Sequence, residues 1–245
     1  HDLEVLRYAN LDTVPWKHKI RVHLQESSLL KQADGLIAHN PIMKSVLVDK
    51  GISEKKIVSL GIFDYLIPNY QDKENLSKEG AIIVAGNLAQ EKAGYLYELP
   101  ARPAYNLYGV GFDEARKLSN ETYFGSFLPD ELPSALEGSF GLVWDGDSSK
   151  TCSGVFGEYL RYNNSHKASL YLASGFPIIV WGQSALANFV LEKECGISVE
   201  SLLDLEEVLD NLSQEEYQDL VKNAKAVGQK IREGSYLLSA LQAFN

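Results

Sequence analysis

Ala81-Ile82-Ile83-Val84-Ala85-Gly86-Asn87 is an apolar run that ends in a glycine turn. An apolar run without polar alternation predicts a strand that is buried on both faces of a parallel sheet. The pattern recurs downstream, with helical stretches at 166–174 and 184–195. Further strands are predicted at 105–110, 123–127, 140–144, 177–181 and 197–199. We therefore predict an α/β fold, with a complete doubly wound domain and a parallel sheet over residues 81–225.

The segment upstream of this domain shows the same alternation of helix and strand. Apolar runs at 35–39 and 56–60 predict two strands. Between them, Asn40 and Pro41 predict a helix start, because asparagine caps helices and proline favours their first position. Residues 1–62 are therefore interpreted as the remainder of an N-terminal Rossmann-like domain.

Two other segments complete the predicted organisation. The polar, turn-rich residues 63–80 predict a linker. Ser213 and Glu216 have the spacing of a capping box that starts a long amphipathic helix, and residues 226–245 are predicted as a final C-terminal helix. The chain opens on His1 rather than methionine, so we expect that part of the first domain precedes it.

Composition narrows the classes of partner. The formal charge is −10, with no stretch of lysine and arginine that would neutralise a run of phosphates, so nucleic acid is not expected as a partner. Cys152 and Cys195 are too few for a disulfide framework or a zinc site, which favours a cytoplasmic setting. No apolar run reaches the roughly 20 residues of a membrane span, although peripheral contact with a membrane surface stays open.

The turn at Gly86 and Asn87 is the first candidate site. Ligands of parallel sheets bind at the carboxyl ends of the strands, and glycine lets a phosphate or sugar approach the backbone closely. An amide such as Asn87 can bond donor or acceptor groups. An ordinary strand-to-helix turn is the alternative.

The second candidate is the loop that follows the predicted strand at 140–144. Trp144, Asp145, Ser153 and Gly154 lie on it and predict a donor-site loop. Asp145 and Asp147 also have the Asp-x-Asp spacing with which GT-A glycosyltransferases hold a divalent cation through carboxylate oxygens. A solvated acidic turn is the third interpretation.

The third candidate lies just before the predicted helix at 166–174. Tyr162, Asn163 and Asn164 cluster there, and Lys167 falls in the first turn of the helix. A cation at this position opposes the helix dipole, which is better explained if an anion binds at the same end. A solvated surface lysine is the alternative.

The opening His1-Asp2 is the last candidate. If it follows a strand of the first domain, Asp2 faces the cleft between the domains and can accept the proton of an acceptor hydroxyl as general base. Alternatively, Asp2 caps a short helix.

Residues 154–181, with His1-Asp2-Leu3-Glu4 and Leu6-Arg7 upstream, resemble the bacterial β-1,6-galactofuranosyltransferases. These proteins are similar to the streptococcal glucosyltransferase that extends glycans on serine-rich adhesins. The resemblance covers nearly the whole chain and is specific in those two stretches.

The resemblance implies a GT-B fold, with two Rossmann-like domains, an acceptor-side N-terminal one that is incomplete here, and a final helix that returns to it. It further implies a UDP-sugar bound mainly by the C-terminal domain, with no metal and no other cofactor. Lys167 would contact the donor phosphates, and Gly86, Asn87 and Lys92 would form a second wall. The streptococcal relative has an arginine in the latter loop, where this chain has Gln90-Glu91-Lys92.

The sequence thus predicts a glycosyltransferase that moves galactofuranose, galactose or glucose from a UDP-sugar to a glycan or lipid-linked glycan acceptor. The β-linked products named for the family imply inversion by a single displacement, with Asp2 as base. A homo-oligomer and contact with the inner face of the cell membrane are further hypotheses. The alternatives are a non-catalytic Rossmann-like partner in a glycan-assembly complex and a GT-A transferase with manganese on Asp145 and Asp147.

Overall fold

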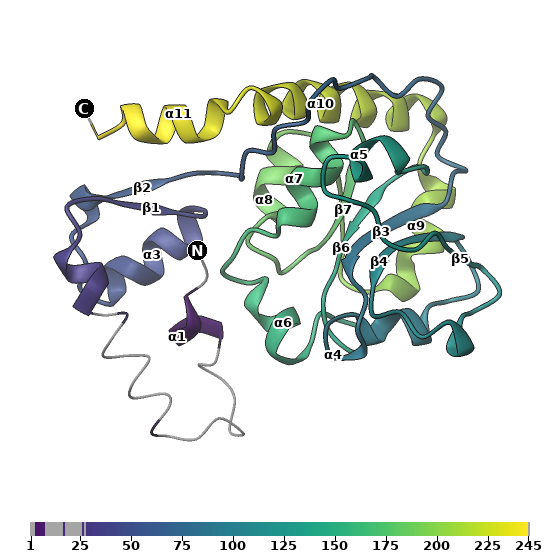
Figure 1. Cartoon of the computed structure of the whole chain (residues 1–245), viewed down its shortest axis with the longest axis horizontal. Coiled ribbons are helices and arrows are strands. Elements are labelled where there is room, and N and C mark those ends of the chain that lie inside the picture. Colours follow the sequence, from purple (N-terminus) through teal and green to yellow (C-terminus); the bar gives the residue numbers. More distant parts are fainter. Residues whose placement is uncertain (1–2, 8–16, 18–25, 27, 245) are drawn as a thin grey trace.

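A computed structural model of the protein describes residues 3–7, 17, 26 and 28–244. These residues form two bodies, each built on its own parallel sheet (Figure 1). The sheets are parallel because each strand is followed by a helical connection that returns the chain to the same edge. In each sheet the carboxyl ends of the strands therefore lie at one edge, and this edge is where parallel sheets bind ligands.

The smaller body pairs two strands around one helix. Its elements are β1 (Leu36–Ala38), α3 (Pro41–Asp49), η1 (Glu54–Lys56) and β2 (Ile57–Ser59). As predicted, Asn40 is the N-cap of α3, and its Oδ1 accepts a hydrogen bond from the Met43 amide at 2.8 Å. Each strand is shorter than its apolar run, because Lys56 belongs to η1, while Gly35, His39 and Leu60 lie outside the paired residues.

The larger body contains six parallel strands in the order β5-β4-β3-β6-β7-β8. The order reverses direction between β3 and β6, so this is a doubly wound sheet with its switch point at those two strands. The strands are β3 (Ile82–Asn87), β4 (Tyr105–Val110), β5 (Glu121–Tyr123), β6 (Gly141–Val143), β7 (Ile178–Trp181) and β8 (Gly196–Val199).

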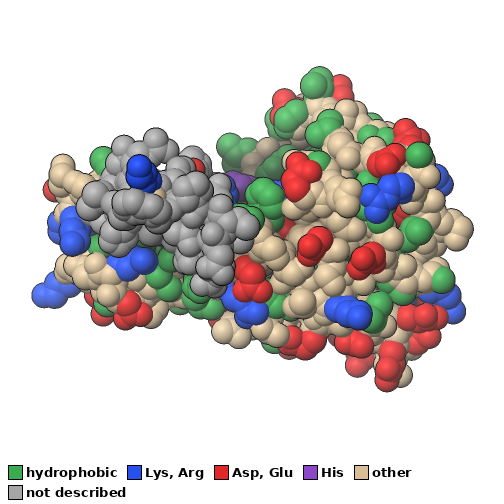
Figure 2. Space-filling model, turned by 90° about the horizontal axis from the view of Figure 1, so that it is seen from below, with side chains coloured by type: hydrophobic (Ala, Val, Ile, Leu, Met, Phe, Trp, Pro, Cys, Tyr) green, Lys and Arg blue, Asp and Glu red, His purple; other side chains and the backbone are tan. Residues whose placement is uncertain are grey.

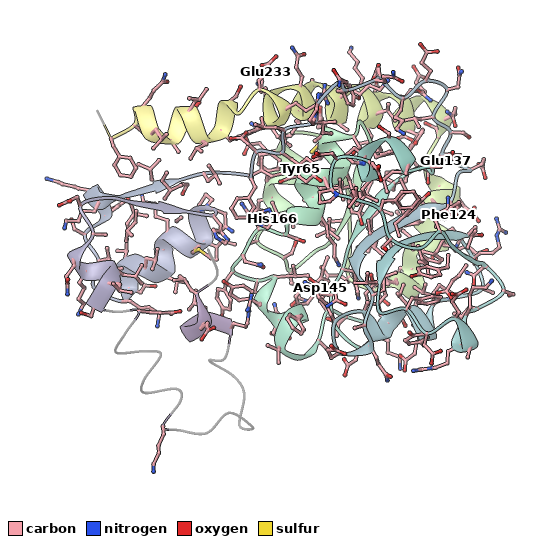
Figure 3. All side chains as sticks on the ribbon, viewed as in Figure 1. Tyr65, Phe124, Glu137, Asp145, His166 and Glu233 are labelled. Atoms are coloured by element: carbon pink, nitrogen blue, oxygen red, sulfur yellow. The ribbon has the colours of Figure 1, made fainter. Side chains whose placement is uncertain are left out.

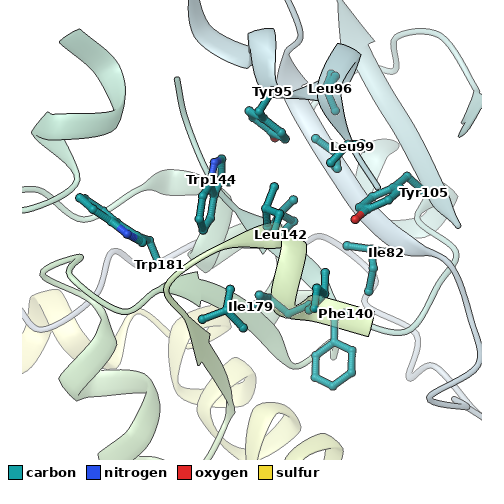
Figure 4. Close-up of a cluster of buried hydrophobic side chains, with 14 of the residues drawn as sticks. Ile82, Tyr95, Leu96, Leu99, Tyr105, Phe140, Leu142, Trp144, Ile179 and Trp181 are labelled. Atoms are coloured by element: carbon teal, nitrogen blue, oxygen red, sulfur yellow. The ribbon is translucent and has the colours of Figure 1, made fainter. Parts of the chain in front are cut away.

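Helices cover both faces of this sheet and enclose two apolar clusters. Trp144 and Trp181 belong to one of them, which is shown in Figure 4, and both are fully buried. The helices and 3-10 turns of this body are α4 (Gln90–Ala93), η2 (Gly94–Glu98), η3 (Glu114–Arg116), α5 (Leu132–Ala135), α6 (Gly154–Tyr159), α7 (His166–Ala173), α8 (Ala187–Glu192), η4 (Leu202–Asp204), α9 (Leu205–Asn211) and α10 (Gln214–Arg232).

The C-terminal helices connect the two bodies. The capping box of Ser213 and Glu216 starts α10, as predicted. This helix runs unbroken through the predicted boundary after residue 225, and the chain bends at Gly234, where φ is +72°. The last helix, α11 (Ser235–Gln242), extends from there toward β1 and β2 (Figure 1).

Two predicted elements differ from the structure. The strand predicted at 123–127 lies instead at β5, which starts two residues earlier and ends at Tyr123, shortly before Gly125 with its left-handed φ of +78°. The helix predicted at 184–195 shortens to α8, and Glu194 adopts a left-handed φ of +47° in the turn before β8. Both differences arise at element ends, where left-handed backbone conformations at Gly125 and Glu194 turn the chain.

The surface of the larger body is mixed in charge. On the face shown in Figure 2, acidic side chains are scattered between isolated lysine and arginine side chains. Among the described residues, no helix is both long and apolar enough to cross a membrane.

Candidate functional site

A hollow of about 190 Å³ lies at the switch point of the larger sheet, where β3 and β6 end. Asp145 and His166 mark this region on the side of the larger body that faces the smaller one (Figure 3). The lining residues come from five separate parts of the chain. They are Arg7, Gly86, Asn87, Lys92, Asp145, Phe156, Tyr159, Asn163, Asn164, Ser165, His166 and Lys167.

Lys167 is the central cation of this hollow. Its Nζ donates to Oδ1 of Asp145 at 2.7 Å and to the carbonyl of Trp144 at 2.9 Å. The Lys167 and Asp145 side chains are 11% and 8% exposed, so the pair is largely withdrawn from water. Lys167 is therefore not a freely solvated surface lysine, which was the alternative interpretation of the sequence.

The start of α7 adds backbone donors beside this cation. Ser165 is the N-cap, and its Oγ accepts from the Lys167 amide at 3.3 Å. The remaining amides of the first turn carry the positive end of the helix dipole. Because residues 168–173 of this helix are all buried, its start is fixed by the core behind it. Lys167 and these amides together favour an anionic ligand.

The Gly86 turn lines the same hollow beside Lys167. Gly86 has a φ of +129°, and a Cβ atom there would lie 3.8 Å from Cε of Lys167. Asn87 Oδ1 accepts from the Ala89 amide at 2.9 Å, which sets the loop that leads to Lys92. The Lys92 Nζ lies 5.3 Å from the centre of the Phe156 ring, at the rim of the same hollow.

Four residues predicted for the donor site do not line this hollow. The Trp144 indole is buried in the core, where its Nε1 donates to the Ser148 carbonyl at 3.0 Å. Ser153 donates to the carboxylate of Asp147, Gly154 begins α6, and the Tyr162 carbonyl accepts from Asn40. These four residues neighbour lining residues along the chain, but their hydrogen bonds hold the loop and the core.

The two asparagines at 163 and 164 both line the hollow, but Asn164 is already engaged. Its Nδ2 donates to the carbonyls of His39 at 2.6 Å and Gly61 at 2.8 Å, and its Oδ1 accepts from Asn40 at 2.9 Å. Its side chain thus joins the two bodies, which the sequence did not predict.

The N-terminal segment reaches the hollow through α1 (Glu4–Arg7). The Leu3 amide donates to the Tyr159 hydroxyl at 2.8 Å, and the Arg7 guanidinium lies 5.0 Å from the centre of the Tyr159 ring. His1 and Asp2, predicted as catalytic residues, lie outside the described residues.

A short aromatic series at the junction of the bodies also escaped prediction. Phe63 stacks on His166 with ring centroids 4.1 Å apart, and its other neighbour is His39 at 4.8 Å. These residues are far apart in the sequence and belong to unremarkable local patterns. No local signal could have found them.

The described acidic, histidine and cysteine side chains form no group of three that could hold a metal ion. Asp145 pairs with Lys167, while Asp147 accepts from Ser153, so the two carboxylates have different partners. Burial raises the pKa of the Cys152 thiol, which keeps it neutral rather than nucleophilic.

The model of the glucosyltransferase 3-like C-terminal domain matches residues 82–244, and that of the N-terminal domain matches residues 1–62. The chain belongs to the glucosyltransferase 3-like family. This confirms the family resemblance drawn from residues 154–181.

Two known glycosyltransferases are similar to this glucosyltransferase 3-like chain along most of its length. It is 38% identical over 222 residues to the β-1,6-galactofuranosyltransferase WbbI of Escherichia coli K12, covering 89% of this chain and 65% of that protein. It is 27% identical over 211 residues to glucosyltransferase 3 of Streptococcus gordonii, covering 85% of this chain and 60% of that protein. The chain thus spans less than two thirds of either relative.

Solved structures of GT-B glycosyltransferases share the fold of this glucosyltransferase 3-like chain. Anabaena Alr3699/HepE, solved in complex with UDP-glucose, superposes with a TM-score of 0.55 at 13% identity, covering 92% of this chain and 68% of that one. The predicted GT-B architecture is confirmed, and it overturns the GT-A alternative.

Proposed function

We propose that this chain carries the donor site of a hexosyltransferase, which moves galactofuranose, galactose or glucose from a UDP-sugar to a glycan or lipid-linked glycan acceptor. The observation that carries the proposal is the position of Lys167 beside the start of α7, at the switch point of the sheet. The family membership supports the same reaction class.

The hollow suits a nucleotide diphosphate for electrostatic reasons. The donor phosphates would lie against the first-turn amides of α7, with Lys167 and Lys92 nearby and Gly86 leaving room for close approach. These groups would stabilise the charge that develops on the departing UDP, which is how a site without a covalent intermediate lowers the barrier. HepE, which shares the fold, was solved with UDP-glucose.

The proposed transfer is a single displacement with inversion. An acceptor hydroxyl oxygen bonds to the anomeric carbon of the sugar as the bond from that carbon to the UDP oxygen breaks. The hydroxyl proton passes to Asp2, and UDP leaves with the electron pair. The role of Asp2 as general base is proposed from the sequence alone. His1 beside it is a second candidate catalytic residue, also proposed from the sequence.

Metal independence is part of the proposal. Lys167, Lys92 and the α7 amides supply the positive charge that a divalent cation supplies in other transferases. Cell-surface polysaccharide or glycoprotein is the destination that we propose for the sugar, and it follows from the family resemblance of the sequence. Homo-oligomerisation, peripheral membrane contact and a cytoplasmic setting stay predictions from the sequence.

Calorimetric titration of the complete protein with UDP, with and without a chelator, tests the donor site. We expect binding that is insensitive to chelator and weakens by about 10- to 100-fold in Lys167→Ala, the value of a charge-assisted hydrogen bond. Lys193→Ala is the matched control, because Lys193 pairs with the exposed Glu192 away from the hollow. Absence of UDP binding in the folded protein would favour the non-catalytic alternative.

A further inference from the structure

Asn40 and Asn164 form a pair of buried amides between the two bodies. They are 2% and 1% exposed, and Asn40 Nδ2 donates to Asn164 Oδ1 at 2.9 Å. Asn40 Nδ2 also donates to the Tyr162 carbonyl at 2.9 Å. We call this pair the amide clasp.

The orientation of both amides is fixed by their surroundings. The two Nδ2 protons of Asn164 face the carbonyls of His39 and Gly61, so its oxygen must face Asn40. Asn40 must therefore donate from its own Nδ2 to this oxygen. Its Oδ1 is then left to accept from the Met43 amide at the start of α3. A carboxylate at either position would face carbonyl oxygens without a proton to offer, although its shape is the same.

The clasp joins the ends of two elements that matter for the proposed reaction. Asn40 lies two residues beyond β1, at the carboxyl end of the smaller sheet. Asn164 directly precedes Ser165, the N-cap of the helix that carries Lys167. Any movement at the clasp therefore changes the distance between the edge of the smaller body and the start of α7.

We infer that Asn40 and Asn164 are positioning residues that hold the acceptor-side body in register with the donor site during sugar transfer, an inference that rests on the proposed function. They act through the relative placement of the two bodies and not by touching the reacting atoms. Misplacement of reacting groups by about 1 Å lowers a rate by about 100-fold. The clasp controls turnover more than it controls UDP binding, because the hollow is lined mostly by the larger body.

Asn40→Asp and Asn40→Ser in the complete protein test this inference. Both replacements retain an N-cap for α3, since aspartate and serine are good capping residues, but neither can donate to Asn164 and Tyr162 as the amide does. Asn106→Asp is the matched control, because Asn106 Nδ2 donates to the Glu137 carbonyl at 2.8 Å near the start of β4. Thermal unfolding checks that each variant is folded.

Three measurements are made on each variant: kcat and KM for transfer from a UDP-sugar, the UDP affinity, and hydrogen exchange of peptides covering 36–43 and 160–167. In both Asn40 variants we expect kcat to fall by at least about tenfold, with UDP affinity unchanged. Exchange in both peptides should quicken by about tenfold, the equivalent of one lost hydrogen bond. Asn106→Asp should change none of these.

Exchange rates in the Asn40 variants that match the Asn106→Asp control would show that the clasp does not join the bodies. Faster exchange with an unchanged kcat would reduce the pair to a structural role and overturn the inference. A loss of UDP affinity that parallels the loss of kcat would also overturn it. An unmodified protein that binds no UDP contradicts the proposed function instead, and the exchange comparison still decides whether the clasp exists.

Discussion

The ammonium nitrogen of Lys167 lies 2.7 Å from the carboxylate of Asp145, inside a hollow that we propose for phosphates. Each charge has left most of its water, so each depends on the other for compensation. The pair also holds the Lys167 side chain beside Gly86 before any ligand arrives. Preorganisation of this kind reduces the conformational entropy that ligand binding would otherwise cost.

We predict that Lys167→Ala destabilises the protein by about 3–5 kcal/mol, because it leaves the Asp145 charge buried without a partner. The double variant Lys167→Ala/Asp145→Asn should recover most of this loss, since no uncompensated charge remains. Urea unfolding of the single and double variants measures both values. Equal stability of the two variants would show that the carboxylate finds another partner or water.

A second prediction concerns Tyr159, which links α6 to α1. Tyr159→Phe removes the hydroxyl that accepts from the Leu3 amide at 2.8 Å but retains the ring beside Arg7. We expect the free energy of unfolding to fall by about 1 kcal/mol and hydrogen exchange in residues 3–7 to become faster. Tyr95→Phe is the comparison, because Tyr95 is buried in the core of the larger body. Unchanged exchange in residues 3–7 would show that the hydroxyl does not hold α1.

Asp64 is predicted to fix α11 against the segment between the bodies. Its carboxylate accepts from the amides of Leu237 at 2.7 Å and Tyr236 at 3.3 Å, in the first turn of that helix. Asp64→Ala should lower the free energy of unfolding by about 0.5–2 kcal/mol, which is the usual contribution of a helix cap. Asp64→Asn should cost less stability, because its single amide oxygen still accepts one of the two hydrogen bonds. Chemical denaturation distinguishes the two variants, and equal losses would show that one accepted hydrogen bond does not cap the helix.

The capping box of α10 predicts a specific pH dependence. Hydrogen bonds from the side chain and backbone of Ser213 lower the pKa of Glu216 below its ordinary value of 4.5. Since the pKa of Glu216 is lower in the folded state, its ionised carboxylate stabilises the folded protein above pH 4.5. This stabilisation is lost as the pH falls through the folded pKa. NMR titration of the Glu216 carboxyl carbon should show this depression, and Ser213→Ala should return the pKa toward 4.5. A pKa that does not respond would place the cause elsewhere.

The sequence by itself determined the alternation of strands and helices, the caps at Asn40 and Ser213, and the position of Lys167 in the first turn of a helix. These features depend on hydrophobic periodicity and on hydrogen bonds between residues close together in the sequence, so a local stretch of sequence is enough to predict them. The sequence also predicted ligand contacts at Gly86, Asn87 and Lys167, because strand ends of a parallel sheet meet at one edge, and the family resemblance added Lys92.

Only the tertiary structure decided how those groups are used. It paired Lys167 with Asp145, turned Trp144 into the core, and assigned Asn164 to the contact between the bodies. The orientation of a buried amide is set by carbonyls that reach it from distant parts of the chain, so no local pattern can specify it. The same holds for Phe63 on His166, whose stacking exists only once the two bodies are placed together.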